Sequence, residues 1–229
     1  MPIKTVTFDA YGTLFDVTAA ARNLANKSGF EHLKEIWPAL ANTWRLKQLQ
    51  YSWLREITGT YKNFWSVTED GLDFALETHG IDDTKTKSAL LDLYWSLAAY
   101  PEVLAMLKEL KKQNIPTSIL SNGSKDMLNA AVKSAGIIDY LDDVLSVEDV
   151  GVFKPNDAVY QMVPDRFNCA AGDVLLVSSN GWDVAGAAGF GFKTLWVNRS
   201  GEPVDKLSHQ PWKIANDLTS VAQLVGENS

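Results

Sequence analysis

The sequence has little of several features that mark particular protein classes. It has one cysteine, Cys169, among 229 residues, which excludes an intrachain disulfide. Its net charge is −7, and no lysine and arginine cluster offers a patch for nucleic acid. No apolar run approaches the ~20 residues of a membrane span, and no signal peptide is evident. We therefore expect a cytoplasmic protein with neither nucleic acid nor a membrane as partner.

What the chain does have is an alternation of strand and helix patterns. Hydrophobic residues make up 46% of the sequence, enough for a sizeable core. Short β-rich runs cover residues 3–8, 117–120, 144–147, 174–178 and 194–197. Helical patterns cover residues 103–113, 125–135, 157–167 and 182–188. This order predicts an α/β fold, a doubly wound parallel sheet with a Rossmann-like core.

The long stretch from residue 17 to residue 97 has no strand signal. It is too long for one crossover and too apolar for a disordered loop. Its tryptophans and its leucines at helical spacing indicate a helical subdomain with a core of its own. We expect a core domain of residues 1–16 and 98–229 and a helical cap of residues 17–97. Because the cap is inserted after the first strand, it should cover the carboxyl end of the sheet.

Polar residues follow four of the predicted strands, at the edge of the sheet where ligands bind. Each has a plain structural alternative: Asp9 and Asp183 can cap turns, Ser121 can cap a helix, Lys154 can lie on the surface, and Tyr160 can be core. Several such groups at matching strand ends favour a site instead. The candidates are Asp9, Thr13, Ser121, Asn122, Lys154, Tyr160, Ser178, Asn180 and Asp183.

The charges in this set suit a catalytic site. A lysine beside a buried aspartate keeps the carboxylate ionised, so Lys154 would keep Asp9 charged. Asp183, opposite Asp9 and positioned by Asn180 and Ser178, would activate water as a general base. Cys169 has no histidine nearby in sequence, and we expect it to be structural.

The first motif, FDAYGTL at residues 8–14, resembles that of the haloacid dehalogenase superfamily. Its leading aspartate is a covalent nucleophile in that superfamily, and phosphatases have a second aspartate two residues later. This chain has Tyr11 there, and a phenol with a pKa of about 10 cannot replace an aspartate as acid. Nearly the whole chain is similar to the L-2-haloacid dehalogenases, on residues 8–16, 44–55, 121–124, 153–155 and 178–183.

The resemblance implies hydrolysis of short L-2-haloacids to D-2-hydroxy acids through an aspartyl ester on Asp9, with inversion at the α-carbon. It places Arg45, from the cap, where it receives the departing halide; a surface ion pair is the alternative for this residue. Thr13 would orient Asp9, and Tyr160 would hydrogen-bond within the site. Residues implied at the substrate are Ala10, Tyr11, Arg45, Leu49, Phe64, Ser121, Asn122 and Trp182.

We expect no metal and no other cofactor. Mg²⁺ prefers several oxygen ligands, usually carboxylates. The fourth motif has Ser178, Ser179 and Asn180 where a phosphatase has its first acid, which leaves only Asp183. The resemblance also implies a homodimer. Two other functions stay open: a phosphatase acting on a small phosphate ester, and a non-catalytic binding module on the same fold.

Overall fold

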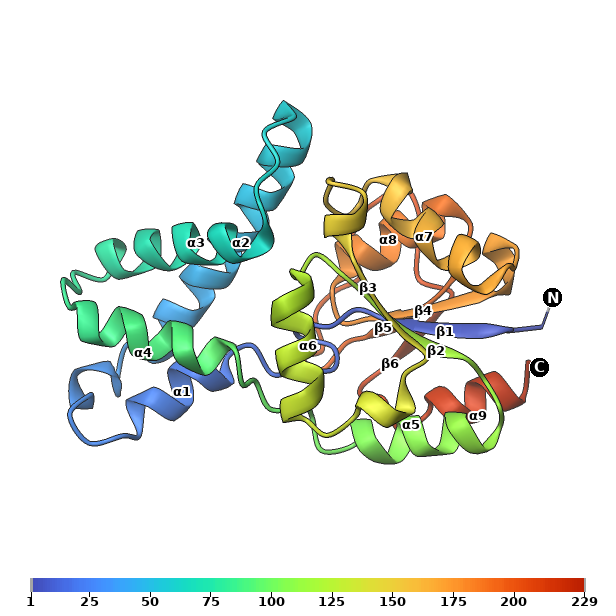
Figure 1. The fold of residues 1–229 in the computed structure, drawn as a ribbon, viewed down its shortest axis with the longest axis horizontal. Coiled ribbons are helices and arrows are strands. Elements are labelled where there is room, and N and C mark those ends of the chain that lie inside the picture. Colours follow the sequence, from blue (N-terminus) through green and yellow to red (C-terminus); the bar gives the residue numbers. More distant parts are fainter. Residues whose placement is uncertain (1, 229) are drawn as a thin grey trace.

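The computed structural model describes residues 2–228 and shows two parts side by side (Figure 1). One part is a parallel sheet with helices on both faces, and the other consists of helices. The α/β class and the inserted helical part predicted from the sequence are both confirmed.

All neighbouring strands of the sheet are parallel, and their order is β3-β2-β1-β4-β5-β6. Every residue of β1, β2 and β4 is buried, as expected where helices cover both faces. The strands are β1 (Thr5–Phe8), β2 (Thr117–Ser121), β3 (Asp143–Ser146), β4 (Val174–Ser178), β5 (Lys193–Val197) and β6 (Lys213–Ala215).

Helices flank the sheet on both sides. On one face lie α5 (Val103–Lys112) and α9 (Val221–Gly226), and on the other lie α7 (Asp157–Phe167) and α8 (Gly181–Phe190) (Figure 1). A further helix, α6 (Lys125–Ser134), packs against β3. The amphipathic pattern explains why α5 forms, because its buried residues recur at helical spacing. These are Val103, Met106, Leu107 and Leu110.

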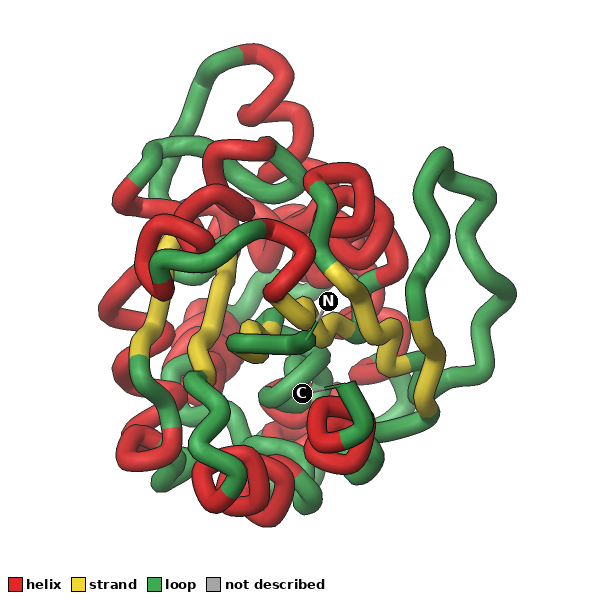
Figure 2. The backbone as a smooth tube through the Cα atoms, turned by 90° about the vertical axis from the view of Figure 1, so that its right-hand side faces the viewer, coloured by secondary structure: helices red, strands yellow, loops and turns green. Residues whose placement is uncertain are grey.

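Two elements of the core were not predicted. The edge strand β6 is three residues long and mostly exposed, so it carries almost no apolar pattern. Helix α9 is six residues long, too short for a clear period. One predicted strand end is also wrong: Val147 opens a short 3-10 turn instead of continuing β3. Figure 2 shows the short edge strand at the margin of the sheet, beside long loops.

The cap contains α1 (Ala19–Ala25), α2 (Trp37–Thr58), α3 (Phe64–Thr78) and α4 (Thr84–Tyr94). Helix α2 begins with a proline in its first turn and ends at Gly59, whose φ of 63° only glycine adopts readily. The side chain of Asn63 caps α3 by accepting from the Ser66 backbone N–H at 2.8 Å. Local capping signals therefore set the limits of the long cap helices.

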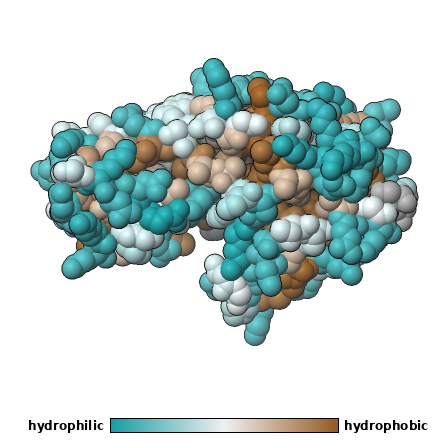
Figure 3. All heavy atoms as spheres, turned by 90° about the horizontal axis from the view of Figure 1, so that it is seen from below, coloured by the Kyte–Doolittle hydropathy of each residue, from teal (hydrophilic) through white to brown (hydrophobic). Residues whose placement is uncertain are grey.

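The chain leaves the core and returns to it at adjacent points. The Asp16 N–H donates to the Ala98 oxygen at 3.0 Å, and the Tyr100 N–H donates to the Leu14 oxygen at 2.9 Å. The boundaries at residues 16 and 98 stay a prediction, but they fall at this crossing. Seen from below, tan and brown atoms gather where the two parts meet (Figure 3). Within residues 2–228, no helix has the length and apolar character needed to cross a membrane.

Candidate active site

The carboxyl ends of the central strands face the cap (Figure 1). Strand β1 is followed by Asp9, β2 ends in Ser121, and β4 ends in Ser178. Ligands of open α/β sheets bind at this edge, where the order of the strands reverses. The order reverses between β1 and β4, so Asp9 lies where a ligand is expected.

Asp9 is only 6% exposed and accepts hydrogen bonds mainly on one oxygen. Its Oδ2 accepts from Thr13 Oγ1 at 3.0 Å and from Asn180 Nδ2 at 2.8 Å. Its Oδ1 lies 3.4 Å from Lys154 Nζ. Burial raises the pKa of Asp9 above its ordinary value, Lys154 opposes this rise, and Asp183 adds to it. Oδ1 is therefore the less engaged oxygen of a desolvated carboxyl group.

The ammonium of Lys154 lies between two carboxylates. Its Nζ is 2.9 Å from Asp183 Oδ2, and the side chain is 1% exposed. Its backbone N–H donates to Asn122 Oδ1 at 2.9 Å. Burial by itself lowers the pKa of Lys154, but the carboxylates of Asp183 and Asp9 outweigh burial and raise it. Lys154 is thus charged at neutral pH, and the surface-lysine alternative is wrong.

Asp183 is fully buried in the first turn of α8. Its Oδ1 accepts from the Tyr160 hydroxyl at 2.9 Å, while its Oδ2 faces Lys154. A Cβ at Gly186 would lie 2.7 Å from Tyr160 Oη and 2.7 Å from Pro155 Cβ. Glycine at this position therefore lets α7 approach α8 closely enough for Tyr160 to reach the carboxylate.

The loop after β4 supports Asp9 more than Asp183. Ser179 N–H donates to Thr13 Oγ1 at 2.8 Å, and Ser178 Oγ accepts from the Asn180 N–H at 3.1 Å. The Asn180 side chain, which we expected at Asp183, donates to Asp9 instead. Asn180 contacts Asp183 through its backbone oxygen, which accepts from the Asp183 N–H at 3.1 Å.

Ser121 and Asn122 are buried at the end of β2. Ser121 Oγ accepts from the Gly123 N–H at 3.1 Å, which leaves the hydroxyl hydrogen available to a ligand. A Cβ at Gly123 would lie 2.7 Å from the ring of Tyr11. Glycine here brings the polar β2 turn against an aromatic ring at the cap side of the site.

Arg45 extends from α2 of the cap to the core. Its Nη2 donates to the Tyr11 backbone oxygen at 3.2 Å and lies 3.3 Å from Asn180 Oδ1. Its Nη1 donates to Gln48 Oε1 at 3.0 Å. The guanidinium therefore contacts the residues that flank Asp9, and the surface ion pair considered for Arg45 is not what the structure has.

A buried polar network behind Arg45 was missed by the sequence reasoning. Gln48 is 1% exposed, and its Nε2 donates to Thr68 Oγ1 at 2.7 Å and to Tyr94 Oη at 3.1 Å. Trp44 Nε1 donates to the Thr68 backbone oxygen at 2.8 Å. The available signal was a glutamine three residues after Arg45, and therefore on the same helix face.

Aromatic side chains stack beside Asp9. The ring of Tyr11 lies 5.9 Å from that of Phe64 and 5.7 Å from that of Tyr94, both at angles under 30°. Burial holds the pKa of Tyr11 well above its ordinary value, so the phenol stays neutral. Ala10, next to Asp9, is also fully buried. The resemblance implied Tyr11 and Phe64 at the substrate but not Tyr94.

Trp182 and Leu49, two other residues that the resemblance implies at the substrate, form no hydrogen bond with Asp9 among residues 2–228. Trp182 packs edge-on against Trp53 of the cap, with ring centroids 5.3 Å apart. Both line an apolar cavity of about 700 Å³ that Asp9 does not line. Leu49 is half-buried on α2. The role of Leu49 and Trp182 at the substrate stays a prediction.

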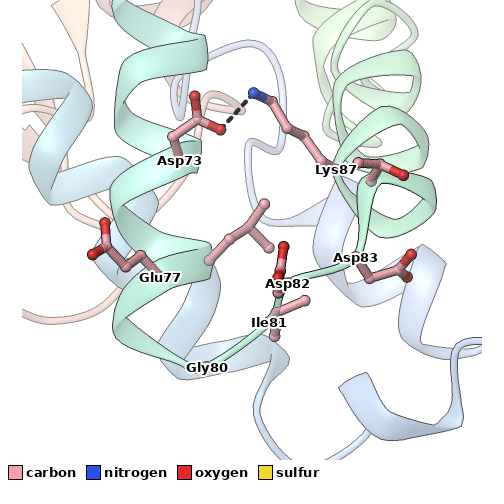
Figure 4. Close-up of a pocket in the computed structure, with 9 residues that line it drawn as sticks. Asp73, Glu77, Gly80, Ile81, Asp82, Asp83 and Lys87 are labelled. Atoms are coloured by element: carbon pink, nitrogen blue, oxygen red, sulfur yellow. Dashed lines mark ion pairs between the residues drawn. The ribbon is translucent and has the colours of Figure 1, made fainter.

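Another cavity, of about 490 Å³, lies at the far end of the cap between α3 and α4 (Figure 4). Acidic side chains line it, and Lys87 forms an ion pair with Asp73 there. None of the predicted site residues lines this cavity. It is separate from the Asp9 site.

The donor set at Asp9 does not fit Mg²⁺. Mg²⁺ needs near-octahedral oxygen ligands at 2.0–2.1 Å. Asp9 and Asp183 are the two carboxylates here, and Lys154 Nζ lies between them. Within residues 2–228, no group of three histidine, cysteine or acidic side chains is placed to hold a metal. Lys154 Nζ supplies a positive charge beside both carboxylates.

Comparison with known proteins matches the chain to one family over most of its length. A family model described as haloacid dehalogenase-like hydrolase matches residues 3–191. The (S)-2-haloacid dehalogenase 1 of Pseudomonas sp. (strain CBS-3) is 40% identical over 97% of this chain and 95% of its own length.

Solved structures agree with this match. A crystal structure of an L-2-haloacid dehalogenase superposes with a TM-score of 0.92 at 38% identity, covering 99% of this chain and 100% of its own. The Xanthobacter autotrophicus L-2-haloacid dehalogenase with chloropropionic acid covalently bound superposes with a TM-score of 0.87 at 35% identity, again covering 99% and 100%. The resemblance predicted from the motifs is confirmed, and this chain is a hydrolase that belongs to the haloacid dehalogenase-like family.

Proposed function

We propose that this protein hydrolyses short L-2-haloacids to D-2-hydroxy acids through an ester on Asp9. The observation that carries the proposal is a buried carboxylate, Asp9, whose Oδ1 contacts only Lys154 among the described residues, together with a cap arginine that contacts Tyr11 and Asn180 beside it. The names of the relatives point to the same substrates, and one neighbour is described with chloropropionic acid covalently bound.

In the first step, Asp9 Oδ1 attacks the α-carbon from the side opposite the halogen. A carbon–oxygen bond forms, the carbon–halogen bond breaks, and its electron pair leaves with the halide. Because attack comes from the rear, the α-carbon inverts. Oδ2, held by Thr13 and Asn180, keeps the carboxylate plane fixed during this displacement.

The substrate carboxylate needs hydrogen-bond donors that are not already bonded to acceptors of the protein. The Ser121 hydroxyl hydrogen is one, as argued from its contact with Gly123. The backbone N–H groups of Ala10, Tyr11 and Asn122 have no hydrogen bond among residues 2–228 and are the others. Together they would fix the line of attack at the α-carbon.

Arg45 is the group best placed to stabilise the departing halide. Its acceptors are the neutral oxygens of Gln48, Tyr11 and Asn180, so its charge is not cancelled by a carboxylate partner. The stacked rings beside it exclude water, which strengthens the interaction of the cation with a developing anion. The four charged side chains of the site, two acids and two bases, sum to zero before substrate binds.

In the second step, Asp183 takes a proton from water, and the resulting nucleophile attacks the ester carbonyl carbon of Asp9. The bond between this carbon and the ester oxygen breaks, and that oxygen takes up the proton held by Asp183, so the hydroxy acid leaves. The new carboxyl group of Asp9 loses the other proton of the water to solvent, which regenerates both carboxylates. The α-carbon is not attacked again, so inversion occurs once. Tyr160 and Lys154 hold Asp183 for this role.

The function is tested by halide release from each enantiomer of 2-chloropropionate, with and without a chelator. We expect release from the L enantiomer alone, unchanged by the chelator, and D-lactate as product. Turnover of a generic aryl phosphate that depends on Mg²⁺ would favour the phosphatase alternative. No turnover of either compound would favour a binding module.

Two further features stay predictions of the resemblance. A homodimer is tested by the mass in solution, and a cytoplasmic location by fractionation of cells that produce the protein. The free thiol of Cys169 is compatible with a reducing compartment.

A further inference from the structure

One side chain of the cap, Glu56 near the end of α2, makes two hydrogen bonds to the core. Its Oε2 accepts from the Phe153 backbone N–H at 2.6 Å. Its Oε1 accepts from Asn156 Nδ2 at 2.8 Å. Both carboxylate oxygens of a cap residue therefore hold the core segment of residues 153–156.

This segment carries Lys154. On its other side, the Lys154 backbone N–H donates to Asn122 Oδ1 at the end of β2. The segment is thus held from the core by Asn122 and from the cap by Glu56. Since Lys154 Nζ is buried between Asp9 and Asp183, a shift of the segment would move the ammonium relative to both carboxylates.

Through Asn156, the contact with Glu56 also bears on the position of helix α7. Asn156 is the N-cap residue of that helix, and its Oδ1 accepts from the Ala158 N–H at 2.9 Å while its Nδ2 donates to Glu56. Helix α7 carries Tyr160, the hydroxyl partner of Asp183. The Glu56 carboxylate therefore also fixes the start of the helix that positions the proposed base.

The same cap helix carries Arg45, 11 residues before Glu56 and therefore roughly 16 Å away along the axis. A rigid helix fixed to the core at both points sets the cap in one position over the site. We propose that Glu56 is a positioning residue, a two-point latch that couples cap placement to the geometry of Lys154 and α7. The proposal rests on the function proposed above, since it assigns Lys154 a role in that reaction.

Replacing Glu56 by alanine removes both hydrogen bonds. We expect kcat for halide release to fall roughly 10- to 100-fold, the cost of a small misplacement of catalytic groups. We also expect faster hydrogen exchange of the amides of residues 153–156. Glu56→Gln keeps one acceptor for Phe153 but presents an amide NH₂ to Asn156, so its kcat should be intermediate.

The pH profile separates positioning from general weakening of the fold. The charged and titratable groups around Asp9 are Lys154, Asp183, Arg45, Tyr11, Tyr94 and Tyr160. Glu56 is not one of them, so its positioning effect on the pKa of Asp9 should act mainly through Lys154, the cation of the segment that Glu56 holds. If Lys154 is displaced, it lowers the pKa of Asp9 less than in the wild type, so this pKa rises. The loss of kcat/KM on the acid side of the pH profile (the acid limb) should therefore occur at higher pH in Glu56→Ala. Loss of the Glu56 charge alone would move it to lower pH.

The matched control is Glu77→Ala, an exposed glutamate of α3 in the same cap, which should behave as wild type. The proposal would be overturned if Glu56→Ala had the kcat, the acid limb and the amide exchange of the wild type. It would also be overturned if turnover were slower but the acid limb of kcat/KM did not shift. Wild-type protein that releases no halide would count against the proposed function. The exchange comparison between Glu56→Ala and Glu77→Ala would then still decide whether the latch exists.

Discussion

Replacing Arg45 by lysine keeps a positive charge on the cap but removes the planar group that delivers it. The guanidinium contacts acceptors on three separate elements: Gln48 on α2, Tyr11 after β1, and Asn180 at the start of α8. An ammonium is a compact, strongly hydrated charge on a flexible stem. It cannot serve these acceptors together and still face the departing halide.

The size of the effect follows from the burial of the site. Removing one preorganised donor to a developing anion costs roughly 2–4 kcal/mol of barrier. This corresponds to a loss of about 30- to 1,000-fold in rate. Because the interaction develops as the halide leaves, kcat and kcat/KM should fall together.

Steady-state chloride release from L-2-chloropropionate measures both constants. The control is Arg55→Lys on the same helix, where the arginine forms an ion pair with Asp70 of α3, within the cap, at 2.7 Å. This variant should keep wild-type rates and lose at most about 1 kcal/mol of stability. Rates within threefold of wild type for Arg45→Lys would refute the assignment of Arg45 to the halide.

Three further changes test the other charged groups. Asp9→Asn should abolish halide release, because an amide lacks the nucleophilic oxygen anion. Asp183→Asn should permit a single burst of halide and leave a protein whose mass is increased by the trapped ester; a burst without the mass increase would argue against Asp183 as base. Lys154→Met removes the cation that opposes the raised pKa of Asp9. Since the carboxylate is the active form and is lost as pH falls, its kcat/KM profile should lose activity at higher pH than wild type.

The sequence predicted best those features that depend on local order. Asp9 follows an apolar run directly, so its place at the end of a central strand could be inferred without knowing any contact. The same holds for Ser121, and for Asp183 after the β4 run. Residues at the ends of parallel strands share one edge of the sheet, which is why these groups meet in the structure.

What the sequence could not predict depends on how the cap helices pack. The network of Gln48, Thr68 and Tyr94 joins three helices, and nothing in the spacing of these residues indicates that they meet. Glu56 looks like an exposed residue near a helix end until the segment of residues 153–156 is placed against it. The direction of the Asn180 side chain also depends on the loop conformation, and the expectation that it serves Asp183 was wrong in this respect.

The direct test of Asp9 as a covalent nucleophile is one turnover in water enriched in the heavy oxygen isotope, with enzyme in excess over L-2-chloropropionate. Water is expected to attack the ester carbonyl of Asp9, so the first heavy oxygen should enter the peptide that contains Asp9, and the hydroxy acid should remain unlabelled. Peptide mass spectrometry measures the first result, and product mass measures the second. Heavy oxygen in the product with none in Asp9 would mean that water attacks the substrate directly, and would contradict the ester mechanism.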